Sequence, residues 1–212
     1  VMQRYSVEQP ELPGTGGELA QHLIKRFDLQ GVSTEVTDLG DHYDPQSHMV
    51  RLSESNWNGR SLTAVAVAAH EVGHAIQHKE GYEPLSRRQK IIKSTTWISR
   101  LAGGIMYIGI GPIIATGLIP LIKIAGALVA LSIIINVVLH LITLDVEFDA
   151  SYKRALPILR EKIPSDYHKA CNTVLTAAAF TYVVGSLASF LSLRYAWPIT
   201  VSYTHLTLPT KA

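Results

Sequence analysis

The stretch 61–78 constrains this chain more than any other, because its histidines and glutamate have the spacing of a metal-binding helix. It reads SLTAVAVAAHEVGHAIQH, in which apolar residues recur at helical spacing after Ser61, a residue suited to cap a first turn. His70 and His74 lie four residues apart, so on a helix both imidazoles project from one face and can bind one metal ion. Glu71 reaches the open side of that ion. The pattern H-E-x-x-H is typical of zinc hydrolases, in which the Glu acts as general base.

A catalytic zinc ion usually has three protein ligands, so a third side chain is needed. The segment 144–151, LDVEFDAS, offers the carboxylates of Asp145, Glu147 and Asp149. Neighbouring acids two residues apart point to different sides of a helix, so only one of them is expected to face the site. Spacing alone leaves open which one does. It also leaves open that these acids only form the polar end of an apolar helix.

Three long segments without a charged side chain occupy the second half of the chain, at 101–122, 124–144 and 170–193. Each reaches the ~20 apolar residues that span a ~30 Å hydrocarbon core. Buried core helices are the alternative, but so small a chain has too little protein to cover three of them. We therefore expect three transmembrane helices, the first kinked or tightly packed because it is rich in Gly and Pro. Two crossings return 145–151 to the side of the membrane where the histidines lie.

The expected fold class is a mainly α membrane protein, with a small α/β zincin-like catalytic domain that contains the H-E-x-x-H helix and with three transmembrane helices. A capping box at Thr15 and Glu18 predicts a helix start, and two short strands are expected at 32–37 and 48–53. The expected parts are a catalytic portion with a basic interfacial segment at 1–100, a transmembrane hairpin at 101–144, a cytoplasmic segment with the third ligand at 145–169, a third transmembrane helix at 170–195, and a tail at 196–212. The tail contains SYTHLTLPTKA, which resembles sequencing-adapter read-through, so we expect it to be non-native.

Charge and cysteine content exclude some classes of function and indicate an orientation. The net charge is +2 without a basic stripe interleaved with aromatic residues, so no nucleic acid partner is expected. The single Cys171 excludes an internal disulfide framework and cysteine-rich metal sites, and is expected to be a small packing residue. Six basic residues lie in 79–100 and five in 153–169, but only Lys123 separates the first two apolar segments. The positive-inside rule therefore predicts that the site faces the cytoplasm.

Other polar residues are weaker candidates for roles at the site. The oxyanion of the reaction has three candidate stabilisers, namely His42, Tyr152 and His168. His78 lies one turn beyond His74, where it either supports a ligand or, as we favour, caps the helix end as a cation. A second ion at Asp41, His42 and Asp44 is conceivable, but a turn built from Asp and Pro needs no metal. Asn136 and His140, within the second apolar segment, are expected to form hydrogen bonds between helices.

The sequence resembles the membrane-spanning neutral zinc metallopeptidases of bacteria over about residues 4–195. The resemblance rests on DHYDP (41–45), VRLSES (50–55), GRSLTAVAVAAHEVGHAIQH (59–78), TLDVEFDAS (143–151) and AAAFTYV (177–183). That family is similar to the gluzincin membrane proteases that include the CAAX prenyl endopeptidases, whose third zinc ligand is the Glu of E-F-x-A-D. Residues 147–150 match the first four positions, so the resemblance implies Glu147 as third ligand. Ser151 stands where those proteases have Asp, so support for a ligand imidazole is expected to come from elsewhere, for example Asp149.

The pattern and the resemblance together predict a membrane-integral zinc metalloendopeptidase with one Zn2+ per chain. His70, His74 and Glu147 are the expected metal ligands and Glu71 is the expected catalytic residue. The expected partners are a protein or peptide substrate and the lipid bilayer, in a multi-pass protein of the bacterial cell (inner) membrane. By analogy with zincins, the strand at 48–53 is expected to pair with an extended substrate.

Two alternatives to this enzyme stay open. One is a zinc-binding membrane scaffold without catalysis, but a structural zinc site needs four protein ligands and has no use for a base at Glu71. The other is an intramembrane site-2-type protease, whose H-E-x-x-H lies within a membrane span. The apolar run directly before His70 has only eight residues, 62–69. A run of this length is too short to reach the middle of a bilayer.

Overall fold

The computed structural model describes residues 1–105, 110–115 and 117–180. The expected tail at 196–212 and the last part of the third expected span therefore lie outside the described residues. The chain divides into two compact units, one formed by 1–86 and 143–181 and the other by 87–142 and 182–212. The described part is mostly helical with one small sheet, which agrees with the mainly α class that the sequence predicts.

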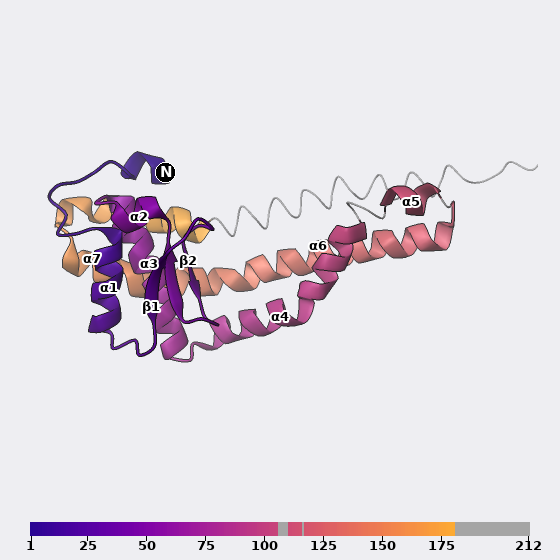
Figure 1. Cartoon of the computed structure of the whole chain (residues 1–212), viewed down its shortest axis with the longest axis horizontal. Coiled ribbons are helices and arrows are strands. Elements are labelled where there is room, and N and C mark those ends of the chain that lie inside the picture. The colour runs from indigo at the N-terminus through magenta and orange to yellow at the C-terminus, as the bar shows by residue number, and fades with distance from the viewer. Residues whose placement is uncertain (106–109, 116, 181–212) are drawn as a thin grey trace, which may run out of the picture. The chain divides into compact units, whose positions relative to one another are not determined.

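The first unit contains the sheet and the H-E-x-x-H helix (Figure 1). Its elements, in chain order, are η1 (Met2–Tyr5), α1 (Gly16–Arg26), β1 (Ser33–Val36), β2 (His42–Asp44), β3 (Met49–Leu52), α2 (Glu54–Asn58), α3 (Leu62–Lys79), η3 (Asp149–Ala155), α7 (Leu156–Lys162) and η4 (Ser165–Tyr167). The predicted capping box begins α1: the hydroxyl of Thr15 accepts from the backbone N–H of Glu18, whose carboxylate accepts from the N–H of Thr15 at 2.8 Å.

The three strands lie in the order β1-β3-β2, with β3 parallel to β1 and antiparallel to β2. The strands predicted at 32–37 and 48–53 are present as β1 and β3, whereas β2 forms within the segment expected to be only a turn. Because β3 is central, the backbone groups on both of its edges already bond to neighbouring strands. The hypothesis that 48–53 pairs with a substrate strand is therefore wrong.

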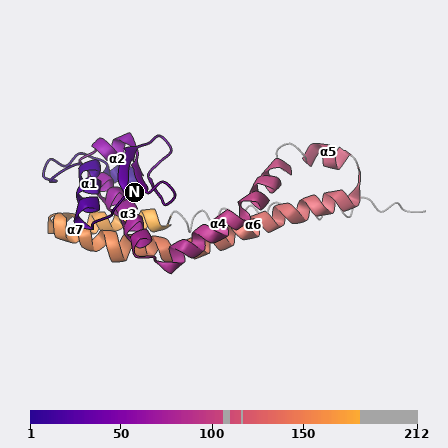
Figure 2. The same ribbon diagram turned by 60° about the horizontal axis from the view of Figure 1, so that its bottom comes forward.

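Helix α3 is the core of this unit. Its N-cap is Ser61, as predicted, whose hydroxyl accepts from the backbone N–H of Ala64 at 3.2 Å. All residues from Leu62 to Gln77 are buried, and α3 contacts α1, the strands β2 and β3, and η3. A helix that is apolar on nearly all sides is expected to be buried on all sides. In this unit the neighbouring helices and strands bury α3. Figure 2 shows α3 alongside the segment that contains η3 and α7.

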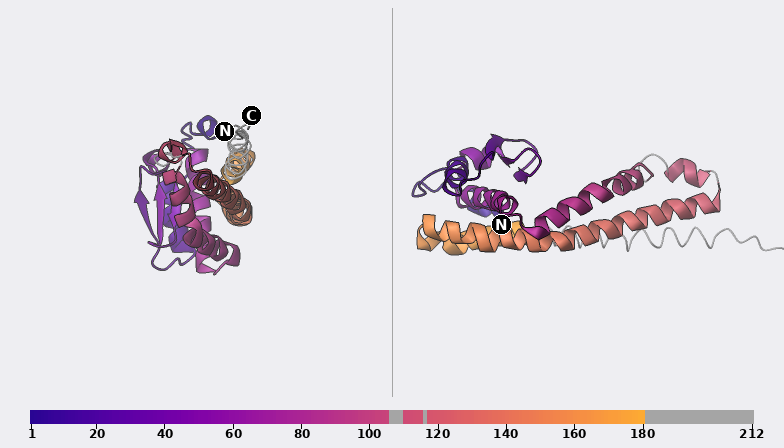
Figure 3. Two further views of the ribbon diagram at one scale, coloured as in Figure 1. Left: turned by 90° about the vertical axis from the view of Figure 1, so that its right-hand side faces the viewer. Right: turned by 90° about the horizontal axis from the view of Figure 1, so that it is seen from below.

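The second unit contains most of α4 (Glu83–Gly104), α5 (Ile110–Ala115) and most of α6 (Ile119–Phe148). Among the described residues, one helix is long and apolar enough to cross a membrane: the unbroken helix Pro120–Lys162, which includes the second expected span (Figure 3). Only 11 % of its most apolar window is buried, so this window is not the core of the described structure.

The other two expected spans are not confirmed, since the described residues cover each of them only in part. The first expected span covers the end of α4, α5 and Gly117. Gly117 has a positive φ of 62°, which is not helical, directly before α6. Glycine adopts this backbone conformation without strain, so Gly117 permits the turn. The beginning of the third, 170–180, is helical, and Cys171, Val174 and Leu175 are fully buried in the core of the first unit. An apolar run suits a protein core as well as a bilayer, so composition alone cannot distinguish the two.

Candidate metal centre

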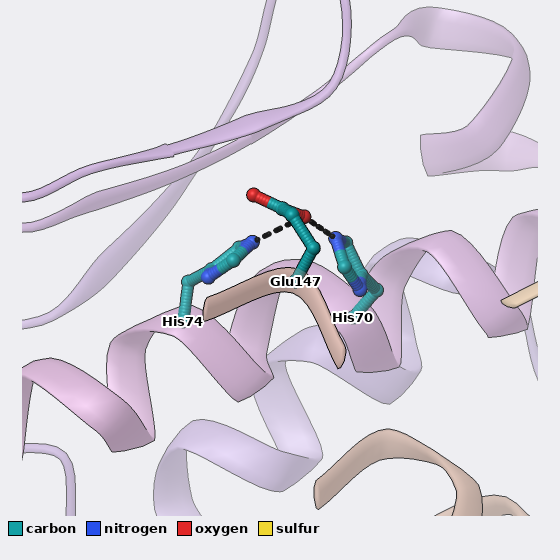
Figure 4. A group of neighbouring side chains, drawn as sticks. All are labelled: His70, His74 and Glu147. Atoms are coloured by element: carbon teal, nitrogen blue, oxygen red, sulfur yellow. Dashed lines mark hydrogen bonds and ion pairs between the residues drawn. The ribbon is translucent and has the colours of Figure 1, made fainter. Parts of the chain in front are cut away.

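Helix α3 and the last turn of α6 bring His70, His74 and Glu147 together within the first unit (Figure 4). The Nε2 atoms of the two imidazoles lie 3.1 Å and 3.4 Å from the same carboxylate oxygen, Oε2 of Glu147. All three side chains are buried, and one ligand atom from each lies within 4.8 Å of the others. Atoms this close can share one ion bound at ~2.0–2.2 Å. No other group of three His, Cys, Asp or Glu residues in the described ranges meets this condition.

Glu147 reaches the histidines because α3 and the following segment approach backbone to backbone. A Cβ on Gly73, between the two histidines in sequence, would lie 3.0 Å from the carbonyl oxygen of Ala150, which is tighter than most real contacts. The absence of a side chain at Gly73 therefore permits the close approach. The segment η3, directly after α6, is a π-helix, a wide turn that often occurs at functional sites.

The charges at this cluster favour a bound cation. Burial raises the pKa of Glu147, but hydrogen bonds from His70 and His74 more than offset burial and hold this pKa well below its usual value. For His74, burial lowers the pKa, and the hydrogen bond and charge of Glu147 raise it, with a net rise. An ionised carboxylate thus stabilises positive charge between the rings. Two imidazoles and a carboxylate, without a thiolate, are ligands that zinc accepts.

Ser151 supports His70, contrary to the expectation that this support comes from elsewhere. The Oγ atom of Ser151 lies 3.0 Å from Nδ1 of His70 and donates to the carbonyl of Leu175 at 3.4 Å. With its one hydrogen directed at that carbonyl, the hydroxyl oxygen can accept the Nδ1–H of His70. A serine hydroxyl thus contacts the imidazole for which the sequence analysis expects support from another residue. The resemblance could not reveal this contact because it compared residue types rather than distances.

Gln77 supports His74 and was not singled out by the sequence analysis. Its side-chain oxygen lies 3.0 Å from Nδ1 of His74, and its nitrogen donates to the carboxylate of Asp149 at 2.8 Å. Asp149 is thus linked to the imidazole of His74 through Gln77. A signal for Gln77 was present, because it follows His74 by three residues and so shares its helix face.

Glu71 is buried next to the cluster on α3, where its negative charge contributes to the raised pKa of His74. No hydrogen bond or ion pair joins its carboxylate to another residue in the described part of the chain. A carboxylate without a protein partner can take a proton from a water molecule.

The remaining candidates make contacts away from the cluster. Asp145 is exposed, so Glu147 is the only one of the three segment carboxylates to lie at the histidines. The three proposed oxyanion stabilisers bond elsewhere: His42 to the carbonyl of Gly40, Tyr152 to Thr176, and His168 to the carbonyl of Ile163.

The acids near β2 need no metal ion. Asp41 accepts from Ser53 and Asn56, and Asp44 accepts from Ser47 and Arg51, so protein donors satisfy both carboxylates.

His78 does not fit the expected cation at the helix end. Its Nδ1 lies 2.8 Å from the hydroxyl of Tyr43, and burial, followed by the charge of His48, lowers the pKa of His78. The neutral form is therefore favoured. Cys171 is buried, as expected of a small packing residue.

Comparisons with known proteins show the family to which the chain belongs. Residues 1–200 match the model of a family described as "Putative neutral zinc metallopeptidase". Over 203 residues the chain is 38% identical to the "Putative membrane protease YugP" of Bacillus subtilis (strain 168), covering 90% of this chain and 83% of that relative. No solved structure matches the chain. The resemblance found in the sequence is thereby confirmed, and the chain belongs to this family of neutral zinc metallopeptidases.

Proposed function

We propose that this protein is a membrane-integral zinc endopeptidase in which His70, His74 and Glu147 hold one Zn2+. The observation that carries the proposal is the convergence of these three buried side chains from two segments far apart in the sequence. Three protein ligands leave a fourth position for water or substrate, whereas a structural zinc site uses four. Within the described residues, no fourth His, Cys, Asp or Glu joins the group, which favours catalysis over a scaffold.

Different residues of the chain have different roles in the proposed hydrolysis. A bound zinc ion would supply a Lewis acid that polarises the scissile carbonyl and lowers the pKa of a water molecule to about 7. Glu71 takes the proton of the attacking water and later delivers it to the leaving amine. Ser151 and Gln77 accept the Nδ1–H of the imidazoles, so that both Nε2 atoms point at the cluster.

An extended substrate has a free strand edge beside α3. Because β3 is central, β2 is one edge strand of the described sheet, and it contacts α3 through Tyr43 and His78. We therefore place the substrate backbone along the outer edge of β2, where it can pair as an added strand.

The alternative of an intramembrane protease requires the H-E-x-x-H helix to lie in lipid. Here α3 is covered by α1, by the sheet and by η3, all in the first unit. This covering favours a site in a folded domain at the membrane surface.

Metal removal tests the proposed activity. Stripping the detergent-purified protein with a chelator is expected to abolish cleavage of an unstructured protein substrate, and adding back about one equivalent of Zn2+ is expected to restore it. The readout is the rate of new amino termini. Unchanged cleavage by a protein shown to be metal-free would contradict zinc catalysis.

The proposed orientation has three membrane spans, with the metal centre on the cytoplasmic side of the bacterial cell membrane. The apolar helix α6 and the basic residues of α4 support it, since positive side chains stay in the cytoplasm. Trp97 on α4 is 62% exposed, as suits a membrane interface.

Cysteine labelling tests this orientation. In a background with Cys171→Ser, Asp38→Cys in the first unit is expected to resist a membrane-impermeant maleimide until cells are permeabilised. Lys123→Cys, between the first two expected spans, is expected to react in intact cells. The reverse labelling pattern would place the metal centre outside the cytoplasm.

A further inference from the structure

Gln77 is a wholly buried polar side chain that the proposed reaction does not use. Its Oε1 lies 3.0 Å from Nδ1 of His74, and its Nε2 lies 2.8 Å from both the carbonyl oxygen of Val146 and Oδ2 of Asp149. It is 0% exposed, so each of its polar atoms needs a protein partner. All of its partners belong to the first unit.

The two partners of Nε2 decide which end of the amide is the donor. The carbonyl of Val146 can only accept, and Asp149 already accepts from the guanidinium of Arg154 at 2.6 Å. The atom between two acceptors must be the NH2 group, so the other atom is the amide oxygen. That oxygen can only accept, and the hydrogen it accepts is the Nδ1–H of His74. The lone pair of His74 Nε2 is then free for a metal ion.

Asp149 is itself held in place by charged groups. Arg154, whose side chain is 13% exposed, donates through Nε to Asp149 and through Nη1 to Glu80 at 2.7 Å. Asp149 accepts hydrogen bonds from both Gln77 and Arg154 through Oδ2, and the ammonium of Lys153 lies 3.7 Å from its Oδ1. A row of hydrogen bonds thus runs from Glu80 at the surface through Arg154, Asp149 and Gln77 to His74, and each bond has one possible donor.

We infer that Gln77 is a positioning residue that holds His74 as the Nδ1–H tautomer, with Nε2 directed at the metal ion, and that Asp149 and Arg154 keep its amide from turning round. The inference rests on the proposed function and deepens it. If the amide turned round, its NH2 group would face Nδ1, and the ring proton would move to Nε2, where it would block the metal. His70 has a different support, the hydroxyl of Ser151.

Zinc affinity and one NMR signal test the inference without an activity assay. Gln77→Leu is expected to weaken zinc binding about 10- to 100-fold, the usual effect of losing an outer hydrogen-bond partner. In the zinc-loaded protein, the Nδ1–H resonance of His74 should be sharp in the wild type and lost to exchange with water in Gln77→Leu. The control is Thr63→Val on the same helix, which removes the hydrogen bond from the Thr63 hydroxyl to the backbone carbonyl of Met2 and should leave both readouts unchanged.

A double variant at positions 77 and 149 distinguishes a role of Gln77 in positioning His74 from a role in packing. It also provides a test if Gln77→Leu does not fold. Gln77→Glu combined with Asp149→Asn gives His74 an oxygen acceptor again. The other oxygen of the new carboxyl group, in its neutral form, donates its hydrogen to the carbonyl of Val146 and accepts from the amide at position 149. This double variant is expected to bind zinc more tightly than Gln77→Leu and to recover the Nδ1–H signal.

Two outcomes would overturn the inference: wild-type affinity with the signal intact in Gln77→Leu, or a double variant that has lost the Nδ1–H signal. A wild-type protein that binds no zinc would instead overturn the proposed function on which the inference rests.

Discussion

Replacing Glu147 with alanine is expected to remove stoichiometric zinc from the purified protein. Glu147 is 1% exposed and its Oε2 lies within hydrogen-bonding distance of the Nε2 atom of His70. Among the described residues, it is the carboxylate that groups with the two imidazoles. Without it, two imidazoles remain, and the affinity should fall by more than the ~100-fold that an outer partner contributes. The measurement is zinc per chain by mass spectrometry, together with affinity by competition.

Asp145→Ala is the matched control for this variant. Asp145 is an exposed carboxylate two residues earlier on the same helix, so its removal should leave zinc at the wild-type level. Undiminished zinc in Glu147→Ala would contradict the site and would make Asp149 the next ligand to test. Thermal unfolding of both variants shows whether any zinc loss results from unfolding.

Glu71→Gln is expected to reduce peptide hydrolysis by about 10²- to 10⁴-fold, the usual contribution of a general base, while zinc stays bound. Glutamine keeps the size and hydrogen-bonding capacity of the buried side chain but cannot take a proton. The effect should fall on kcat rather than on zinc content, because Glu71 is not part of the ligand group.

Glu54→Gln, on the exposed surface of α2, makes the same chemical change outside the cluster and should retain full activity. Hydrolysis by Glu71→Gln at the wild-type rate would show that Glu71 is not the base. Zinc binding without hydrolysis in the wild type would favour the scaffold instead.

Local features of this fold were predictable because they depend on residues close in sequence. The caps at Thr15 and Ser61 lie where the sequence predicts them, and α3 has the expected length. The meeting of the two histidines is a consequence of helical spacing alone. The choice of Glu147 among three acids needed the family resemblance, because spacing left it open.

Features that depend on tertiary packing were not predictable. The order of the strands put β3 in the centre, and no pattern within β3 indicates which strands lie beside it. The contacts of Ser151 and Gln77 depend on the close approach at Gly73 and on the π-helix, which local propensities do not reveal. The apolar run from Ala170 illustrates the same limit, since its first turns pack into the protein core.

X-ray absorption at the zinc edge of the purified wild-type protein tests the central claim most directly. The account predicts about one zinc per chain, with scattering from two imidazoles and from oxygen at ~2.0–2.2 Å and no sulfur shell at ~2.3 Å. A chain without stoichiometric zinc, or zinc bound through sulfur or through four imidazoles, would contradict a site built from His70, His74 and Glu147.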